Sequence, residues 1–228
     1  MVQDSTSHAP PRRDDHPGDG VVRSTSRLEA FADAVFAIAF TLPIVEIRLP
    51  EPSSRFLADL FSLWPEWLGY GLATLVIGIY WVQHHFSGAI YRTVGHRFLL
   101  ATMLFLAMIG FIAFPTRAFA DSLAVPAAAR QGGLIYVLSL SALALTWWVK
   151  WRTGLAMGEV DERLDPAYVQ RLNRTYRRST LLMLVAGATA FLRWEVGLAI
   201  ATAVTLFHLR PPETPVYGTR APIVEGEA

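Results

Sequence analysis

Residues 27–47, RLEAFADAVFAIAFTLPIVEI, are the stretch of the chain that decides its fold. The run is apolar and, at about 20 residues and 1.5 Å of rise per residue, is long enough to cross a bilayer as one helix. It nevertheless begins with Arg27 and Glu29, carries Asp33 about one and a half turns further on, and ends near Glu46. A plain membrane anchor has no use for these charges, so this segment is predicted to be a membrane helix with a further task.

The composition of the whole chain is typical of a membrane protein. Of its 228 residues, 53% are hydrophobic and 17% are charged, whereas an average soluble domain is roughly 25% charged. The chain has 13 Phe, 7 Trp, a single lysine and no cysteine. The lack of cysteine excludes disulfides, thiolate metal sites and cysteine nucleophiles. The net charge of +1 gives no indication of a nucleic-acid partner.

Six apolar segments come close to the length that a membrane-spanning helix needs. The sequence therefore predicts an all-α, polytopic membrane protein with one six-helix domain over residues 26–209. The spans are expected at residues 28–47, 67–86, 98–119, 132–151, 179–192 and 194–209.

The connections between these spans carry further expectations. Pro115 is expected to kink the third span. The polar stretch 152–179 either lies along the membrane surface or extends the fifth helix. The last two spans are short and meet at Arg193, which predicts a tight hairpin; one long helix followed by a re-entrant piece is the alternative.

The positive charges orient the predicted helices. If the N-terminus is cytoplasmic, fifteen of the twenty Lys and Arg residues fall in inner segments and only five in outer ones: Arg48, Arg55, Arg117, Arg130 and Arg193. Because positive residues accumulate on the cytoplasmic side, both termini are predicted to be cytoplasmic in a multi-pass protein of the cell (inner) membrane. Residues 1–25 are predicted to form a disordered cytoplasmic tail, and residues 210–228 a second cytoplasmic tail.

Asp33 is the charged group that most needs a partner, because an ionisable side chain within a span is costly. Arg27 lies six positions earlier, on roughly the opposite side of the helix. The end of the second span, YWVQHHF, offers Trp81, His84 and His85 at a similar depth. An indole and an imidazole can each donate a hydrogen bond to a carboxylate. The alternative is an Asp33 that is simply interfacial and hydrated.

The same residues give little support for metal binding or catalysis. Adjacent histidines on a helix point about 100° apart, and no cysteine or carboxylate cluster completes a metal site. A His–Asp pair without an activated nucleophile makes no catalytic set, and Ser87 lacks a nucleophile-elbow motif. We therefore expect no enzyme, no metal and no cofactor. A secondary transporter, proton-coupled through Asp33 and His84 or His85, is the second hypothesis.

Further along the first span, Ile38, Thr41 and Val45 share one helix face. Apolar stripes usually mean core or lipid contact. Thr41 is the anomaly, and its hydroxyl can bond back to the carbonyl of Ala37. Alternatively, if this face lines a symmetric axis, the three side chains form a narrow and mostly dry constriction, which can gate conduction by dewetting.

The first span together with WVQHHF resembles the prokaryotic branch of the transmembrane protein 175 family of potassium-permeable channels. The family motifs R-x-x-x-F-S-D and W-x-x-H-H are matched by Arg27, Phe31, Asp33, Trp81, His84 and His85. Ala32 stands where the first motif has Ser, so it cannot supply the hydroxyl that the family places in the packing network below the pore.

This resemblance implies a homotetramer in the lipid bilayer, with the first helix of each copy around a K⁺-permeable pore and no re-entrant filter loop. It implies modest selectivity for K⁺ over Na⁺ and a constriction at Ile38, Thr41 and Val45, where bacterial relatives usually have Leu at the last position. It also implies a structural network at the pore base: Arg27, Phe31, Asp33, Trp81, His84 and His85.

Overall fold

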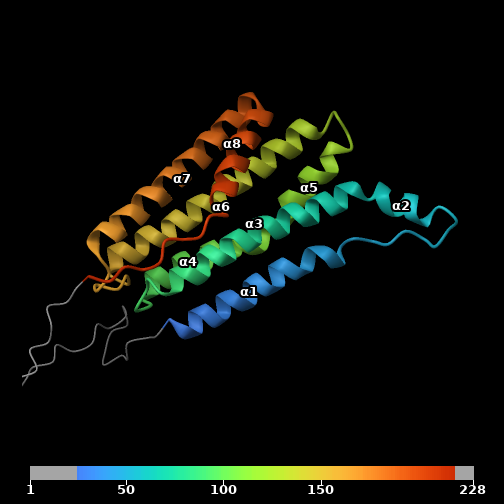
Figure 1. Ribbon diagram of the computed structural model, residues 1–228. Coiled ribbons are helices and arrows are strands. Elements are labelled where there is room, and N and C mark those ends of the chain that lie inside the picture. The colour runs from blue at the N-terminus through green and yellow to red at the C-terminus, as the bar shows by residue number, and fades with distance from the viewer. Residues whose placement is uncertain (1–24, 219–228) are drawn as a thin grey trace, which may run out of the picture.

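The computed structural model describes residues 25–218, and in that range the chain is helical, with isolated bridges but no regular β-strand (Figure 1). This confirms the predicted all-α class. The helices are α1 (Ser26–Val45), α2 (Phe56–Ser62), α3 (Trp64–Gly88), α4 (His96–Phe111), α5 (Ala113–Leu123), α6 (Ala129–Met157), α7 (Pro166–Leu192) and α8 (Trp194–Phe207). Apart from residue 25, the tail predicted at 1–25 lies outside the described residues, as do residues 219–228 of the second tail.

The helices run up and down in one bundle, with α1 at one edge and α7 and α8 at the other (Figure 1). Between these edges, α3 and α4 pack against α1, α5 packs against α3 and α6, and α6 also packs against α4, α7 and α8. At one end of the bundle α1 and α4 begin and α3 and α6 terminate; we call this the basal end. The opposite end is called the distal end. Because α1 contacts only α3 and α4 to any extent, most of its surface lies outside the bundle.

Three helical stretches in residues 25–218 are long and apolar enough to cross a membrane: α1, His96–Leu123 and α6. The pair α2 and α3 makes a fourth if its 51° bend is counted within one span. Helix α8 is apolar but shorter. The basal half of α7 carries four arginines, at positions 171, 174, 177 and 178, which leaves a short apolar remainder. The six predicted segments are all helical, but a count of six membrane crossings stays a prediction.

The third predicted span breaks between α4 and α5, at Ile112. Pro115 follows three residues later. A proline has no N–H for the helix ladder, and its ring clashes with the carbonyl four residues earlier, here that of Phe111. The break therefore lies one turn before the proline that was expected to cause the kink.

The fifth helix is longer than the predicted 179–192 segment because α7 begins at Pro166. Proline suits the first helical turn, and the Asp165 side chain caps the helix by accepting a hydrogen bond from the Tyr168 backbone N–H at 2.8 Å. The polar stretch 152–179 thus extends α6 and α7 and does not form a separate surface helix. Only Arg193 separates α7 from α8, as the predicted hairpin requires.

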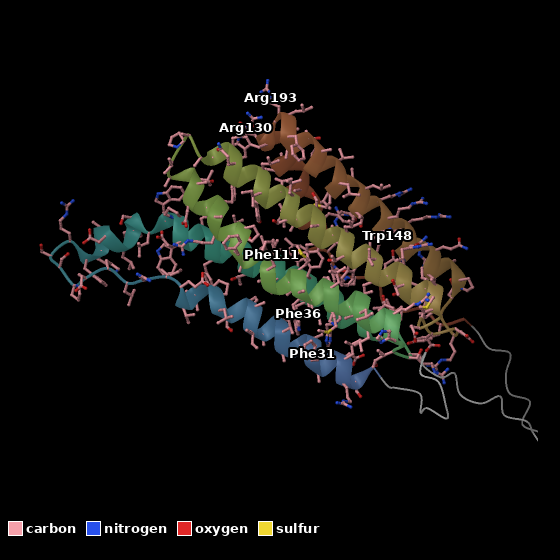
Figure 2. The ribbon with its side chains drawn as sticks, turned by 180° about the vertical axis from the view of Figure 1, so that it is seen from behind. Phe31, Phe36, Phe111, Arg130, Trp148 and Arg193 are labelled. Atoms are coloured by element: carbon pink, nitrogen blue, oxygen red, sulfur yellow. The ribbon has the colours of Figure 1, made fainter. Side chains whose placement is uncertain are left out.

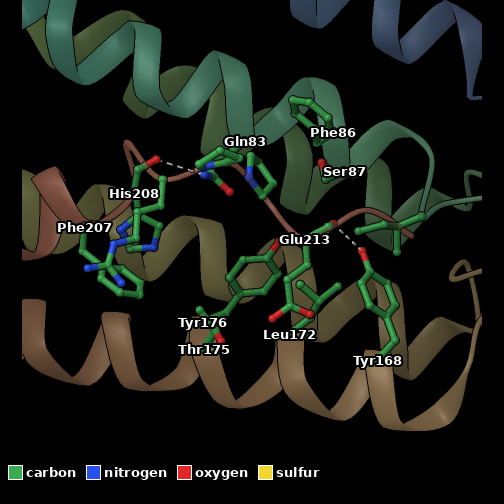
Figure 3. Close-up of a pocket in the computed structure, with 14 residues that line it drawn as sticks. Gln83, Phe86, Ser87, Tyr168, Leu172, Thr175, Tyr176, Phe207, His208 and Glu213 are labelled. Atoms are coloured by element: carbon green, nitrogen blue, oxygen red, sulfur yellow. Dashed lines mark hydrogen bonds between the residues drawn. The ribbon is translucent and has the colours of Figure 1, made fainter. Parts of the chain in front are cut away.

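A C-terminal strap, residues 209–218, returns across the basal end and holds the loop between α6 and α7. The backbone N–H of Asp165 donates to Val216 O at 2.8 Å, and that of Gly218 donates to Arg163 O at 2.9 Å. The Tyr168 hydroxyl donates to Glu213 O at 3.1 Å (Figure 3). The described part of the predicted C-terminal tail is therefore packed against the bundle.

Asp161 gives this loop a pH dependence. The side-chain hydrogen bonds of Arg163 hold the pKa of Asp161 below its ordinary value of 3.8. A carboxyl whose pKa is depressed by folding stabilises the fold above its unfolded pKa, and that stabilisation is lost as the pH falls through the folded value. We expect Arg163→Gln to lower the thermal midpoint at pH 7, and the difference from wild type to shrink as the pH falls below about 3.8 toward the lower folded pKa of Asp161.

Differential scanning fluorimetry of both proteins at pH 7 and at pH 3 would measure this change in the thermal midpoint. Arg174→Gln is the matched control, because Arg174 is exposed on α7 and forms no ion pair among the described residues. A constant difference between Arg163→Gln and wild type from pH 7 to pH 3 would contradict the assignment.

Candidate functional site

Helix α1 is seated on the bundle by a narrow stripe of small and aromatic side chains. Its buried residues, Ala32, Phe36 and Ala39, recur at i, i+4 and i+7 and so share one face. The ring of Phe36 lies 6.1 Å from that of Phe105 on α4 and 5.5 Å from that of His84 on α3. The two alanines allow the α1 backbone to approach α3 and α4 closely. Phe36 fills the space between α1 and these two helices (Figure 2).

The opposite face of α1 is apolar and uncovered. Ile38, Thr41 and Val45 are all exposed, Ile38 to 57% and Val45 to 73%. At 100° per residue, these three side chains point away from the buried stripe. Only 17% of the apolar window of α1 is buried, compared with 44% in His96–Leu123 and 61% in α6. This chain therefore leaves its first helix as the least covered of its candidate spans.

Thr41 makes the local hydrogen bond that its position in a helix allows. Its hydroxyl donates to the Ala37 carbonyl at 2.8 Å. This bond uses the hydroxyl proton but not the lone pairs of the oxygen, which can still accept a hydrogen bond or coordinate a cation. The back-bond and a role on the exposed face are therefore compatible.

Asp33 is joined to α3 by Trp81. The indole N–H of Trp81 donates to Asp33 Oδ1 at 3.2 Å, and the Trp81 ring stacks on His85 with ring centroids 5.6 Å apart. Asp33 and Trp81 border an open groove of ≈ 510 Å³ between α1 and α3, which Thr41 also lines. Asp33 is exposed within the chain, and the bond to Trp81 fixes its carboxylate toward α3.

The structure places His84 in a different cluster, with Lys150 of α6. Both side chains are buried, and Lys150 Nζ lies 2.9 Å from His84 Nδ1. A second, longer contact of 3.5 Å joins Nζ to Ser87 Oγ. In the described part of the chain, His84 Nε2 is buried and has no hydrogen-bond partner. The sequence reasoning missed Lys150, whose signal was a lone lysine at the end of an otherwise apolar span.

Aromatic faces surround the Lys150 amine. Nζ lies 4.7 Å from the ring centroid of Trp147, 5.3 Å from that of Tyr91 and 5.6 Å from that of Phe105. A cation is attracted to aromatic faces at such distances, and an N–H of the Lys150 amine is placed to donate a hydrogen bond to His84 Nδ1. The cluster links α3 to α6 next to the buried stripe of α1, because the His84 ring contacts both Lys150 and Phe36.

Arg27 and Phe31 lie on the outer side of α1. Both are exposed, Phe31 to 47%, and Figure 2 shows Phe31 on α1 nearer the basal end than Phe36. Among residues 25–218, no hydrogen bond or ion pair joins either residue to Asp33 or the α3 end. Within one chain, the structure therefore brings together Asp33, Trp81 and His85, and separately His84 and Lys150, but not the whole predicted network.

A second concavity lies at the basal end, between α3, α7 and the C-terminal strap (Figure 3). This cavity of ≈ 180 Å³ is lined by polar and apolar groups, including Gln83, Tyr176 and His208, and Gln83 Nε2 donates to the His208 carbonyl at 3.1 Å. No group of three or more His, Asp or Glu side chains in residues 25–218 has the arrangement of a metal site. The uncovered face of α1 is thus the stronger candidate for function.

The chain is similar in sequence to known proteins over most of its length. Residues 27–113, which include α1 and α3, match the family described as endosomal/lysosomal potassium channel TMEM175. A relative described as a potassium channel, from Chamaesiphon minutus, is 32% identical over 193 residues, covering 82% of this chain and 94% of the relative. The endosomal/lysosomal proton channel TMEM175 of Danio rerio is 36% identical over 80 residues, covering 31% of this chain and 15% of the relative.

The fold is also similar to a solved structure. The crystal structure described as a lysosomal potassium-selective channel TMEM175 homolog from Chamaesiphon minutus has a TM-score of 0.70 and 29% identity, covering 83% of this chain and 98% of that one.

Fold and site together define a polytopic helical membrane protein whose first helix presents an apolar face to something outside the chain. Its similarity over nearly the whole length of a bacterial relative identifies it further: the chain belongs to the TMEM175 family.

Proposed function

We propose that this protein is a potassium-permeable cation channel in which α1 from each of four copies lines the pore. The uncovered apolar face of α1 carries this proposal. A hydrophobic helix that is 17% buried within its own chain needs either lipid or other copies of itself to cover it. The potassium-channel descriptions of the bacterial relative and of the similar crystal structure support the second option.

In this arrangement Ile38, Thr41 and Val45 form rings around the axis. The Ile38 and Val45 rings make a dry constriction whose dewetting opposes ion passage. The Thr41 ring lies between them. Because each Thr41 hydroxyl donates to the Ala37 carbonyl, its lone pairs face the axis and suit a cation better than an anion. A ring of single hydroxyls is a weak substitute for a hydration shell, so selectivity for K⁺ over Na⁺ is modest.

The membrane placement belongs to the same proposal. With both termini in the cytoplasm, the basal end faces the cytoplasm and the chain crosses the cell (inner) membrane six times. The four α7 arginines then lie on the cytoplasmic side, as the positive-inside rule requires. No catalytic group or cofactor is needed for this function, since the permeant K⁺ is the only ligand.

Planar-bilayer recording of the purified protein between potassium and sodium solutions tests the function. Unitary current steps with a reversal potential displaced toward that of K⁺ support a channel. Flux that saturates with substrate and depends on a proton gradient would instead show a secondary transporter. The buried His84–Lys150 pair favours that second candidate to a degree, because ionisable groups inside a membrane bundle often take part in proton relays.

Trp81 is proposed to anchor α1 through Asp33. We expect Trp81→Phe to lower the free energy of unfolding by about 1 kcal/mol, because it removes one hydrogen bond to a charged but exposed acceptor. The resulting drop in the thermal midpoint of the tetramer can be measured by fluorescence-detected size exclusion. Trp64→Phe is the control, since Trp64 is similarly exposed and makes no side-chain hydrogen bond among the described residues. Equal losses in the two variants would argue against the anchor.

A further inference from the structure

An open groove runs along the outside of the bundle between α4 and α6, at the basal end. Its volume is ≈ 640 Å³, and its floor is almost entirely apolar. Leu100 and Leu104 line it from α4, and Trp148 and Val149 from α6. From Arg97 to Leu104 the groove extends over eight residues of α4, roughly 10 Å along the bundle axis. Figure 2 shows Trp148 in the basal half of α6, on the face turned to the viewer.

Two arginines line this groove: Arg97 at its basal end on α4, and Arg152 on α6, about one turn before Ala156. Arg97 belongs to the first turn of α4, where the positive end of the helix dipole adds to its charge. The Arg152 guanidinium lies 5.7 Å from the Trp148 ring centroid. Stacking on an aromatic face leaves the N–H groups at the guanidinium edge free to bind a phosphate.

Neither arginine is neutralised within the chain. In residues 25–218, no carboxylate lies within ion-pair distance of Arg97 or Arg152. The two buried acids of the neighbouring loop are already engaged, Glu159 by the Thr93 hydroxyl and Asp161 by Arg163. The groove therefore combines an apolar floor with two positive charges that no carboxylate in residues 25–218 neutralises.

We propose that this groove binds an anionic phospholipid of the leaflet at the basal end. The phosphate lies between Arg97 and Arg152, and one acyl chain runs over Leu100, Leu104 and Val149. A charged headgroup above an apolar tail matches both the charge and the polarity gradient of the groove. The proposal needs only the membrane placement of the bundle, and it does not depend on conduction.

Native mass spectrometry of the purified full-length protein, with added phosphatidylglycerol or phosphatidylcholine of the same acyl chains, tests this site. The wild-type protein is expected to bind phosphatidylglycerol more tightly than phosphatidylcholine. R97Q/R152Q removes two positive charges from the site, so it should weaken phosphatidylglycerol binding about thirtyfold and leave phosphatidylcholine binding nearly unchanged. A156W, which fills the exposed groove without changing charge, should weaken the binding of both lipids.

The matched control is R174Q/R177Q, which removes two exposed charges from α7 at the same end of the bundle. Equal losses in this control would overturn the site in favour of general surface charge. If glycerol phosphate displaced all of the bound phosphatidylglycerol, the site would be one for a free anion and not for a lipid. Dissociation of the oligomer by A156W would show that a second copy of the chain, and not lipid, occupies the groove.

Discussion

Ile38→Asn is expected to raise the basal potassium current of the reconstituted protein by about tenfold or more. In the proposed pore, four Ile38 side chains face one another and exclude water, so that an ion must shed part of its hydration shell to pass. Asn at this position offers hydrogen bonds to water and keeps the ring wet. Lowering the barrier by about 1.4 kcal/mol is sufficient for a tenfold change in rate.

Ile44→Asn provides the control for this experiment. It makes the same substitution in the same helix at a residue that is 39% exposed, but six positions further along, which turns the side chain about 120° away from the Ile38 direction. Both variants should be checked for an unchanged oligomeric state before recording. If Ile44→Asn raised the current as much as Ile38→Asn, or if Ile38→Asn had no effect in an intact oligomer, the constriction would not lie at Ile38.

The sequence was most informative where one local rule acts alone. Apolar length placed six helical segments, and the tight hairpin at Arg193 and the disruption near Pro115 followed from local stereochemistry. The exact bounds did not follow, because α6 and α7 continue beyond their apolar parts as ordinary polar helices. Their extensions to Met157 and from Pro166 depend on an αL glycine, Gly158, and on the Asp165 cap.

The site was harder to predict because its contacts join different helices. Helical periodicity places Ile38, Thr41 and Val45 on one face, but it does not say which face of α1 the bundle covers. That choice follows from the seat made by Ala32, Phe36 and Ala39, which needs the packed structure. Similar depth made Trp81, His84 and His85 equivalent candidates for Asp33.

Among residues 25–218 only Trp81 donates a hydrogen bond to Asp33, whereas His84 contacts Lys150 of α6. Adjacent side chains on a helix must point in different directions, so His84 and His85 could not both have pointed toward Asp33. Depth alone could not decide between them.

The His84–Lys150 pair should show strong energetic coupling. His84→Leu leaves the buried Lys150 amine without its main acceptor, and we expect a loss of about 2–4 kcal/mol in the free energy of unfolding. Lys150→Met retains most of the side-chain volume in the aromatic surroundings and leaves only a neutral imidazole nitrogen unpaired. Its expected cost is smaller, about 1–3 kcal/mol.

The double variant His84→Leu/Lys150→Met replaces both members of the pair by apolar groups of similar size, and such replacements are often nearly neutral. Its loss should therefore be smaller than that of His84→Leu alone, with a coupling energy of about 2 kcal/mol or more. Unfolding in mixed micelles by SDS titration measures all four corners of the cycle. Additive losses would mean that the 2.9 Å contact between Nζ and Nδ1 contributes little, and that α3 is held to α6 by the surrounding aromatic packing instead.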